Sequence, residues 1–167
     1  MATQVTFPRL DEGASYYFAT PYRSDQQIDE KPFSPPNHSD LPWPVICRLK
    51  QLRWPVESPL KGIFQEDRGR RKGIDFETEL GETVHAAYHG TVIFAGWTIE
   101  EGFCVHINHG WGLFTHYARC AHLWVETGAE VRRGDIIAQS DKSALEFEVR
   151  LHDQAISPFW ATDHLAI

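Results

Sequence analysis

The chain has 167 residues, 42% hydrophobic and 13% aromatic, which is enough for one domain with a buried core. Its formal net charge of −7 argues against nucleic-acid binding, because phosphate contacts need a basic face. The three cysteines form no Cys-x-x-Cys pair, so neither a zinc knuckle nor a thioredoxin-type site is predicted.

Nothing in the sequence predicts a membrane span or a secretory signal. No apolar run approaches the length that crosses a bilayer. The N-terminus has no basic start followed by an apolar core. We therefore expect a cytoplasmic location, or one within a virion or another complex, rather than secretion. Peripheral contact with a membrane complex stays open.

Residues 1–53 are predicted to form an extended arm rich in proline and aromatic side chains. Nine of the ten prolines lie in residues 1–60, and proline removes the backbone donors that helices and central strands need. A flexible linker would not need the aromatic residues, so we expect the arm to pack on its own domain or on a partner. That partner would be another protein or a multisubunit complex. Residues 45–54 fit either a short helix or a strand.

Residues 54–167 are predicted to form an all-β sandwich or barrel. Eleven of the twelve glycines lie in residues 62–134, between short runs of alternating apolar and polar residues. The run GFCVHINHGWG, residues 102–112, alternates in this way, and LFTHYARC, residues 113–120, follows as its hairpin partner. Strands recur to the end of this part with no convincing helix between them, which is typical of a sandwich or barrel.

The run ALEFEVR, residues 144–150, predicts a strand with one apolar and one charged face. Its apolar face is expected to pack against the core and consists of Leu145, Phe147 and Val149. Glu148 and Arg150 are expected to alternate toward water, and Glu146 shares their face. A row of charges on one face of a strand is the feature that needs an explanation.

Five segments, in this order and with matching spacing, resemble the LytM/lysostaphin-type zinc endopeptidases: KGIDF, GETVHAAYHGTVIFAGW, HINHGWGLFTHYAR, VETGAEVRRGDIIA and FEVR. The resemblance runs from about residue 54 to about residue 158. It implies a LytM-like β-domain with a duplicated hybrid motif, of bacterial or phage origin. Members of that family cleave peptidoglycan.

The resemblance also implies which positions would hold zinc. In the family, a His and an Asp from an H-x-G-x-D segment and the second His of an H-x-H strand bind the metal. Those positions are Arg71, Asp75 and Glu146 here, and Ala144 stands at the first His of H-x-H. A further helper His falls on Arg119. His122 lies nearby, but using it would require a compensating deletion.

These replacements predict a domain without zinc, cofactor or catalytic residues. Arginine offers no lone pair and cannot be a zinc ligand. We expect the Arg71 guanidinium to lie between the Asp75 and Glu146 carboxylates in place of the cation. The predicted function is that of an inactive peptidase-like protein that binds other proteins or forms part of a larger assembly. The resemblance leaves two alternatives.

One alternative is a regulator of a cell-wall hydrolase, a role that the resemblance implies for relatives lacking zinc ligands. The other is an active metallo-endopeptidase with a rebuilt site. That site would need a histidine from elsewhere beside Asp75 and Glu146. His116 and His122 are the candidates, because both could line the groove of the former active site.

Overall fold

Nine strands and one helix make up the part of the chain that the structure, a computed structural model, describes: residues 41–57, 73–142, 144–152 and 154–156. The elements, in chain order, are α1 (Trp43–Leu49), β1 (Ile74–Phe76), β2 (Thr83–His85), β3 (Gly90–Thr98), β4 (Gly102–Asn108), β5 (Leu113–Leu123), β6 (Glu130–Val131), β7 (Ile136–Ser140), β8 (Leu145–Leu151) and β9 (Gln154–Ile156). The prediction of an all-β domain is confirmed.

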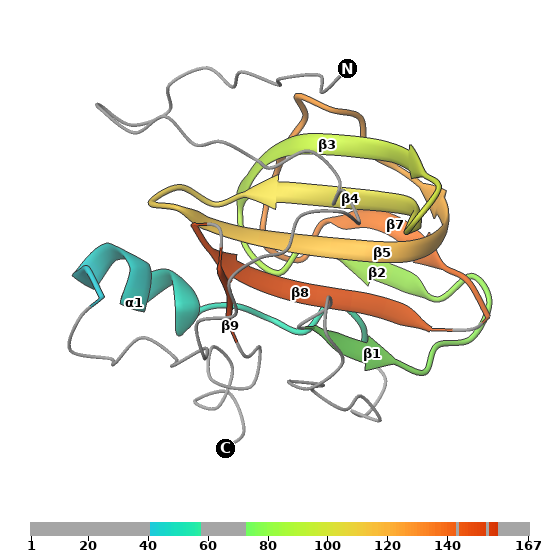
Figure 1. Ribbon diagram of the computed structural model, residues 1–167, viewed down its shortest axis with the longest axis horizontal. Helices are drawn as coiled ribbons and strands as arrows, with labels where there is room; N and C mark the ends of the chain where they lie inside the picture. The colour runs from blue at the N-terminus through green and yellow to red at the C-terminus, as the bar shows by residue number, and fades with distance from the viewer. Residues whose placement is uncertain (1–40, 58–72, 143, 153, 157–167) are drawn as a thin grey trace, which may run out of the picture.

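All pairings in the sheet are antiparallel, and the main path runs β1-β8-β5-β4-β3-β6 (Figure 1). The predicted hairpin of β4 and β5 is present. The long strand β5 has two partners on its other edge: residues 113–118 pair with β8, and residues 120–123 pair with β7. Arg119 lies at the change of partner and has a positive φ of 61°, so β5 is bulged at this residue.

The core lies on the inner face of β8, β5 and β1. The apolar face predicted for β8 is confirmed, since Leu145, Phe147 and Val149 are fully buried. Phe147 packs against Tyr117 of β5 at a ring-centroid distance of 5.3 Å. Rings from β1 and from the segment before it, Phe76 and Trp54, complete this aromatic group.

The charged face of β8 differs from the prediction. Glu146 and Glu148 are 6% and 7% exposed, so these carboxylates do not alternate into water. Arg150 is half-buried and donates from Nη1 to Oε1 of Glu148 over 3.0 Å. A buried carboxylate needs compensating charge or donors, and these partners form the candidate site described below.

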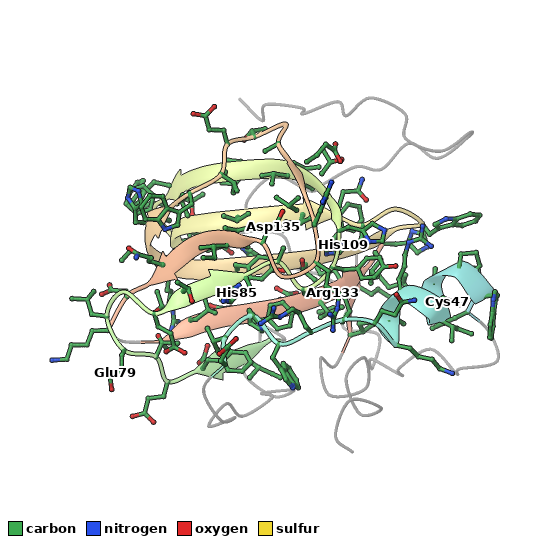
Figure 2. All side chains as sticks on the ribbon, turned by 180° about the vertical axis from the view of Figure 1, so that it is seen from behind. Cys47, Glu79, His85, His109, Arg133 and Asp135 are labelled. Carbon is green, nitrogen blue, oxygen red and sulfur yellow. The ribbon has the colours of Figure 1, made fainter. Side chains whose placement is uncertain are left out.

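Residues 45–54, which the sequence assigned to either a helix or a strand, begin within helix α1. Prolines occupy positions 42 and 44, where the first turn of a helix tolerates them. Val45 and Leu49, one turn apart, face the core. Arg48 then donates from Nε to the backbone oxygen of His109 over 3.0 Å. Figure 2 shows this helix, marked by Cys47, at the end of the β-domain near His109.

The chain after the helix is also fixed to the strands. Leu52 and Val56 belong to the core cluster, and Arg53 N–H donates to the Ala87 carbonyl over 3.0 Å. Arg133 Nε donates to the Gln51 carbonyl over 2.6 Å. The part of the predicted arm from residue 41 onward therefore packs on its own domain. Residues 1–40 lie outside the described residues, and the domain boundary between residues 53 and 54 stays a prediction.

A buried hydrogen-bond network fixes the inner face of β5. Ala87 N–H donates to the Tyr117 hydroxyl over 2.8 Å, and that hydroxyl is hydrogen-bonded to the Thr115 hydroxyl at 2.9 Å. Thr115 also contacts Nε2 of His109 at 2.7 Å, and His109 Nδ1–H donates to the His89 carbonyl. With Thr115 and Tyr117 held inward, His116 and Ala118 face the opposite side of the sheet.

Candidate functional site

The positions that would hold zinc in a LytM-type domain meet where β1, β8 and β5 lie side by side. Asp75 of β1 and Ala118 of β5 are the register partners of Glu146 on β8. Asp75 is exposed, and Ala144 is half-buried just before the strand. Arg71 lies outside the described residues, so its predicted place between the two carboxylates stays a prediction.

A different arginine contacts the buried carboxylate. The bulge at Arg119 brings its Nη2 to 3.8 Å from Oε2 of Glu146. The Glu146 side chain is 8% exposed and the Arg119 side chain 40%. The Arg119 backbone N–H donates to the Glu101 carbonyl over 3.0 Å, which ties the bulge to the β3–β4 turn.

The residues at this position do not fit a zinc ion. Zinc sites in proteins use thiolate, imidazole and carboxylate donors. Here a guanidinium, which has no lone pair, stands within ion-pair distance of Glu146 and supplies the positive charge itself. The arrangement pairs a buried carboxylate with a guanidinium.

Two substitutions of Arg119 separate the free energy contributed by this ion pair from the cost of the positive φ at this residue. A half-exposed pair at 3.8 Å is worth at most about 1 kcal/mol, so Arg119→Ala should lower the free energy of unfolding by that amount or less. Arg119→Gly also loses the pair but relieves the positive φ, so it should be more stable than the alanine variant by about 1 kcal/mol. Urea unfolding of both variants measures the difference, and an alanine variant as stable as the glycine variant would show that φ is not strained.

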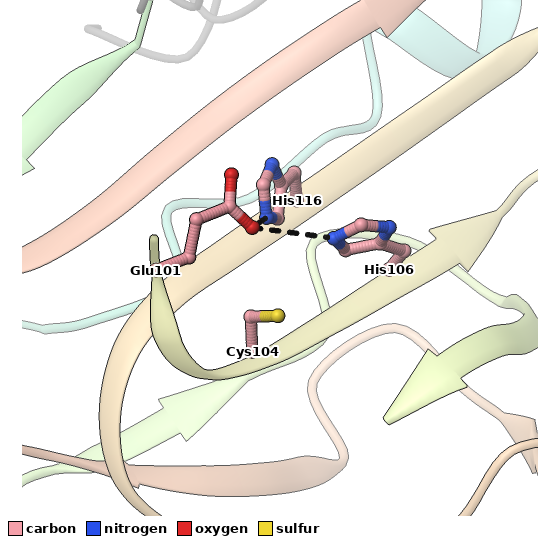
Figure 3. A group of neighbouring side chains, drawn as sticks. All are labelled: Glu101, Cys104, His106 and His116. Atoms are coloured by element: carbon pink, nitrogen blue, oxygen red, sulfur yellow. Dashed lines mark ion pairs between the residues drawn. The ribbon is translucent and has the colours of Figure 1, made fainter. Parts of the chain in front are cut away.

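A second cluster of polar side chains lies beside the first, and Figure 3 shows its four members converging. They come from the β3–β4 turn, from β4 and from β5: Glu101, Cys104, His106 and His116. One donor atom from each lies within 4.8 Å of the other three. Oε2 of Glu101 is 3.1 Å from Nε2 of His116 and 4.0 Å from Nε2 of His106.

Strand register explains why this cluster forms. His106 and His116 are direct partners across β4 and β5, with ring centroids 4.0 Å apart. Cys104 lies two residues before His106, so both side chains point to the same face of β4. Glu101 is positioned by the turn, where its N–H donates to Oγ1 of Thr98 over 3.1 Å.

The cluster continues onto the charged face of β8. Nδ1 of His116 is 3.7 Å from Oε2 of Glu148, and Glu148 also accepts from Arg150. Burial alone would raise the pKa of Glu148, but the contact with His116 and the charges of Arg150 and His116 lower it below its ordinary value. Glu148 is therefore a carboxylate near neutral pH despite its burial.

The two histidines of the cluster differ in charge. Burial lowers the pKa of His116, but polar contacts with Cys104, Glu101 and Glu148, with the charge of Glu101, raise it well above its ordinary value. Burial, the His116 charge and the Arg150 charge hold the pKa of His106 well below its ordinary range. In this state His116 is an imidazolium between two carboxylates, and His106 is neutral.

The structure places the residues that the sequence analysis named as follows. Asp75, Glu146 and Arg119 were assigned by resemblance, and the fold brings them together. His116 and His122 were the candidates for a rebuilt site. His116 instead contacts Glu101 and Glu148, and the His122 ring packs on Trp124 at 4.6 Å.

Glu101, Cys104 and His106 were not predicted as site residues. The signal that could have found His106 was the hairpin itself. Numbering outward from the HGWG turn places His106 opposite His116. Glu101 gave no such signal, because its side chain is aimed by a turn rather than by strand alternation.

The strand order and the antiparallel pairings define a zinc-peptidase-like β-domain. The model of peptidase family M23 matches residues 69–158, which is more than half of the chain. The chain therefore belongs to peptidase family M23.

Its curated relatives include proteins of the bacterial envelope. The chain is 33% identical over 111 residues to Lipoprotein NlpD/LppB homolog of Pseudomonas aeruginosa, covering 63% of this chain and 37% of that protein. It is 29% identical over 116 residues to Murein hydrolase activator NlpD of Escherichia coli, covering 66% and 31%. The chain thus spans only about a third of the length of these two relatives.

Solved structures agree on the fold. Lysostaphin from Staphylococcus simulans aligns with a TM-score of 0.57 at 19% identity, covering 68% of this chain and 55% of that chain. The SpoIIQ–SpoIIIAH pore-forming complex contains a chain that aligns with a TM-score of 0.58 at 21% identity, covering 70% and 93%. At these identities the likeness shows the fold alone, and the fold occurs both in a peptidase and in a pore-forming complex.

The expected cytoplasmic or virion-associated location is wrong. The relatives are named as lipoproteins, and one of them is Outer membrane antigenic lipoprotein B of Histophilus somni, 29% identical over 136 residues, covering 75% of this chain and 40% of that protein. These names point to the cell envelope. The prediction failed because it rested on the lack of a signal at the start of the chain. Within the described residues, no helix is long and apolar enough to cross a membrane.

Proposed function

We propose that this chain is a catalytically inactive member of peptidase family M23 that binds a cell-wall hydrolase in the envelope and regulates its activity. The observation that carries the proposal is the ion pair between Arg119 and Glu146. A metallopeptidase needs a cation with an open position for water at this point of the fold. A guanidinium neutralises the carboxylate but cannot polarise water or a scissile carbonyl as a metal does.

The relatives favour regulation over a purely structural role. Several are named as murein hydrolase activators. Of the three positions assigned to zinc ligands in this chain, Asp75 keeps the family's residue, whereas Arg71 and Glu146 replace histidines. A structural subunit of a larger assembly is the second candidate. It rests on the likeness to a pore-forming complex, which is a likeness of fold alone.

Exposed apolar side chains at the β3–β4 hairpin support a protein-binding role. Trp97 and Phe103 are direct partners across the hairpin and are 60% and 42% exposed, and Ile99 in the turn is 86% exposed. Neighbouring exposed aromatic and aliphatic side chains are enriched at protein interfaces. The partner would contact this hairpin. The part of the predicted arm before residue 41 would add to the contact.

A peptidoglycan-release assay tests the proposal directly. The full chain alone should release no dye from labelled peptidoglycan, with or without added zinc, because the family's metal position cannot activate water. Mixed with a cell-wall amidase from the same envelope, it should change the rate of release by at least severalfold. Lysostaphin, with a chelator added in a parallel reaction, is the control for the assay.

Two results would overturn parts of the proposal. Release by the chain alone that a chelator abolishes would mean an active metallo-endopeptidase with a rebuilt site. No effect on any amidase, together with stable co-purification in a large complex, would favour the structural subunit.

A further inference from the structure

The cluster of Glu101, Cys104, His106 and His116 has the donor set of a transition-metal site, and it is separate from the position where the family holds zinc. We propose that it binds one zinc ion, with one ligand from each residue. This inference does not depend on the proposed function. A metal held by four protein ligands would stabilise the fold and would leave the chain without peptidase activity.

The geometry of the cluster is close to that of a tetrahedral zinc site. The four donor atoms lie within 4.8 Å of one another. Zinc–nitrogen and zinc–sulfur bonds of about 2.0–2.3 Å place donors roughly 3.3–3.8 Å apart. Side-chain rotations that close a separation of up to 4.8 Å by about 1 Å would complete the site. The Glu101 and His116 donor atoms, 3.1 Å apart, are already slightly closer than that range.

The chemistry of the donors selects the metal. A thiolate and two imidazoles with one carboxylate suit zinc and similar borderline ions. Magnesium and calcium prefer sites made only of oxygen ligands, so neither fits. Cys104 is buried, and its sulfur lies within 4.8 Å of a donor atom of each of the other three residues.

The surroundings provide the supporting contact that metal-binding histidines use. The Glu148 carboxylate faces Nδ1 of His116 at 3.7 Å, while Nε2 of the same ring faces Glu101 and the other donors. Zinc would displace the Nε2 proton of the imidazolium, and the carboxylate beside Nδ1 favours the tautomer that keeps the remaining proton there. Arg150 holds Glu148 in place through a hydrogen bond of 3.0 Å.

The site is displaced from the family's metal position along the same face of the sheet. His116 is the register partner of Glu148, and Ala118 is the partner of Glu146. Two residues along a strand correspond to a shift of about 7 Å. On this face of the sheet, Arg119 supplies the positive charge beside Glu146, and the donors for a metal are gathered beside Glu148.

Binding of zinc alone to the full chain tests the proposal. After treatment with a chelator and dialysis, the protein should take up one zinc ion per chain, measured by elemental analysis. Cobalt used as a probe should give the near-ultraviolet charge-transfer band of a thiolate ligand and the visible bands of a tetrahedral ion. The wild-type spectrum tests thiolate ligation without any substitution.

Substitutions assign the ligands. Cys104→Ser should abolish the charge-transfer band, and Cys104→Ser and His106→Gln should each weaken zinc affinity at least a hundredfold. Matched controls are Cys47→Ser on the helix and His122→Gln against Trp124, which should bind as the wild type does. Circular dichroism of each metal-free variant checks that it is folded.

Asp75→Asn distinguishes the two positions on the sheet. It should leave zinc affinity unchanged, because Asp75 belongs to the family's position and not to this cluster. The proposal is overturned if the folded wild type takes up no zinc or gives no thiolate band with cobalt. It is also overturned if Asp75→Asn abolishes binding while Cys104→Ser does not.

Discussion

Replacing His116 by alanine should lower the free energy of unfolding of the metal-free protein by about 3 kcal/mol. In this protein the imidazolium lies between Glu101 and Glu148, and Glu148 is almost fully buried. Removing the cation leaves the Glu101 and Glu148 carboxylates without the positive charge between them, although Arg150 still donates to Glu148. Burying charge that is poorly compensated is costly. Urea unfolding at pH 6 in the presence of a chelator measures the loss.

Two further variants show whether charge or volume causes this loss. His122→Ala removes an exposed imidazole and should change stability by less than about 0.5 kcal/mol. Adding Glu148→Gln to His116→Ala should recover part of the loss, since the double variant buries one carboxylate fewer. If the double variant is less stable than His116→Ala, the loss comes from packing and not from charge.

Acidification should destabilise the protein through His109, which lies at the end of β4 and has no part in either polar cluster. Burial lowers the pKa of this histidine from 6.5 to about 4. The folded-state pKa is thus below that of the unfolded chain, so the unfolded chain binds the proton more tightly. The stabilisation is complete above pH 6.5 and is lost as the pH falls toward 4, by about 3 kcal/mol in total.

Comparison with His109→Gln isolates this contribution. The glutamine side chain at position 109 does not titrate. The difference in unfolding free energy between wild type and variant should therefore shrink steadily as the pH falls from 6.5 to 4. Other groups, such as Glu148 with its lowered pKa, contribute equally to both proteins and cancel. A difference that stays constant over this range would contradict a buried, neutral His109.

The fold was predictable because short stretches of sequence are enough to indicate its strands and turns. Glycine-separated alternating runs predicted strands, and five segments in order predicted their arrangement as a LytM-like domain. The same segments assign Asp75 and Glu146 to the family's zinc position by resemblance, and the strand register makes these two residues direct partners. The helix Trp43–Leu49 was harder to assign, because the apolar pattern of residues 45–54 fits a short helix or a strand equally well.

The polar site was less predictable because it depends on details that no local pattern encodes. Arg119 lies at a bulge of β5, at the point where the strand changes partner from β8 to β7, and its side chain contacts Glu146. Glu148 is buried, although the alternation of apolar and charged residues along β8 predicts that this face is exposed to solvent. His106 and His116 are direct partners in the β4–β5 pairing. A register shifted by one residue would move one of these side chains to the other face of the sheet.

The most direct test is the position of zinc in crystals of the full chain grown with zinc, located by anomalous scattering at the zinc edge. The structure predicts one strong peak among Glu101, Cys104, His106 and His116, and none beside Asp75 and Glu146, where Arg119 supplies the positive charge. A peak bound by Asp75 and Glu146 would contradict the loss of the family's metal site. The lack of any peak in the cluster would contradict the second site.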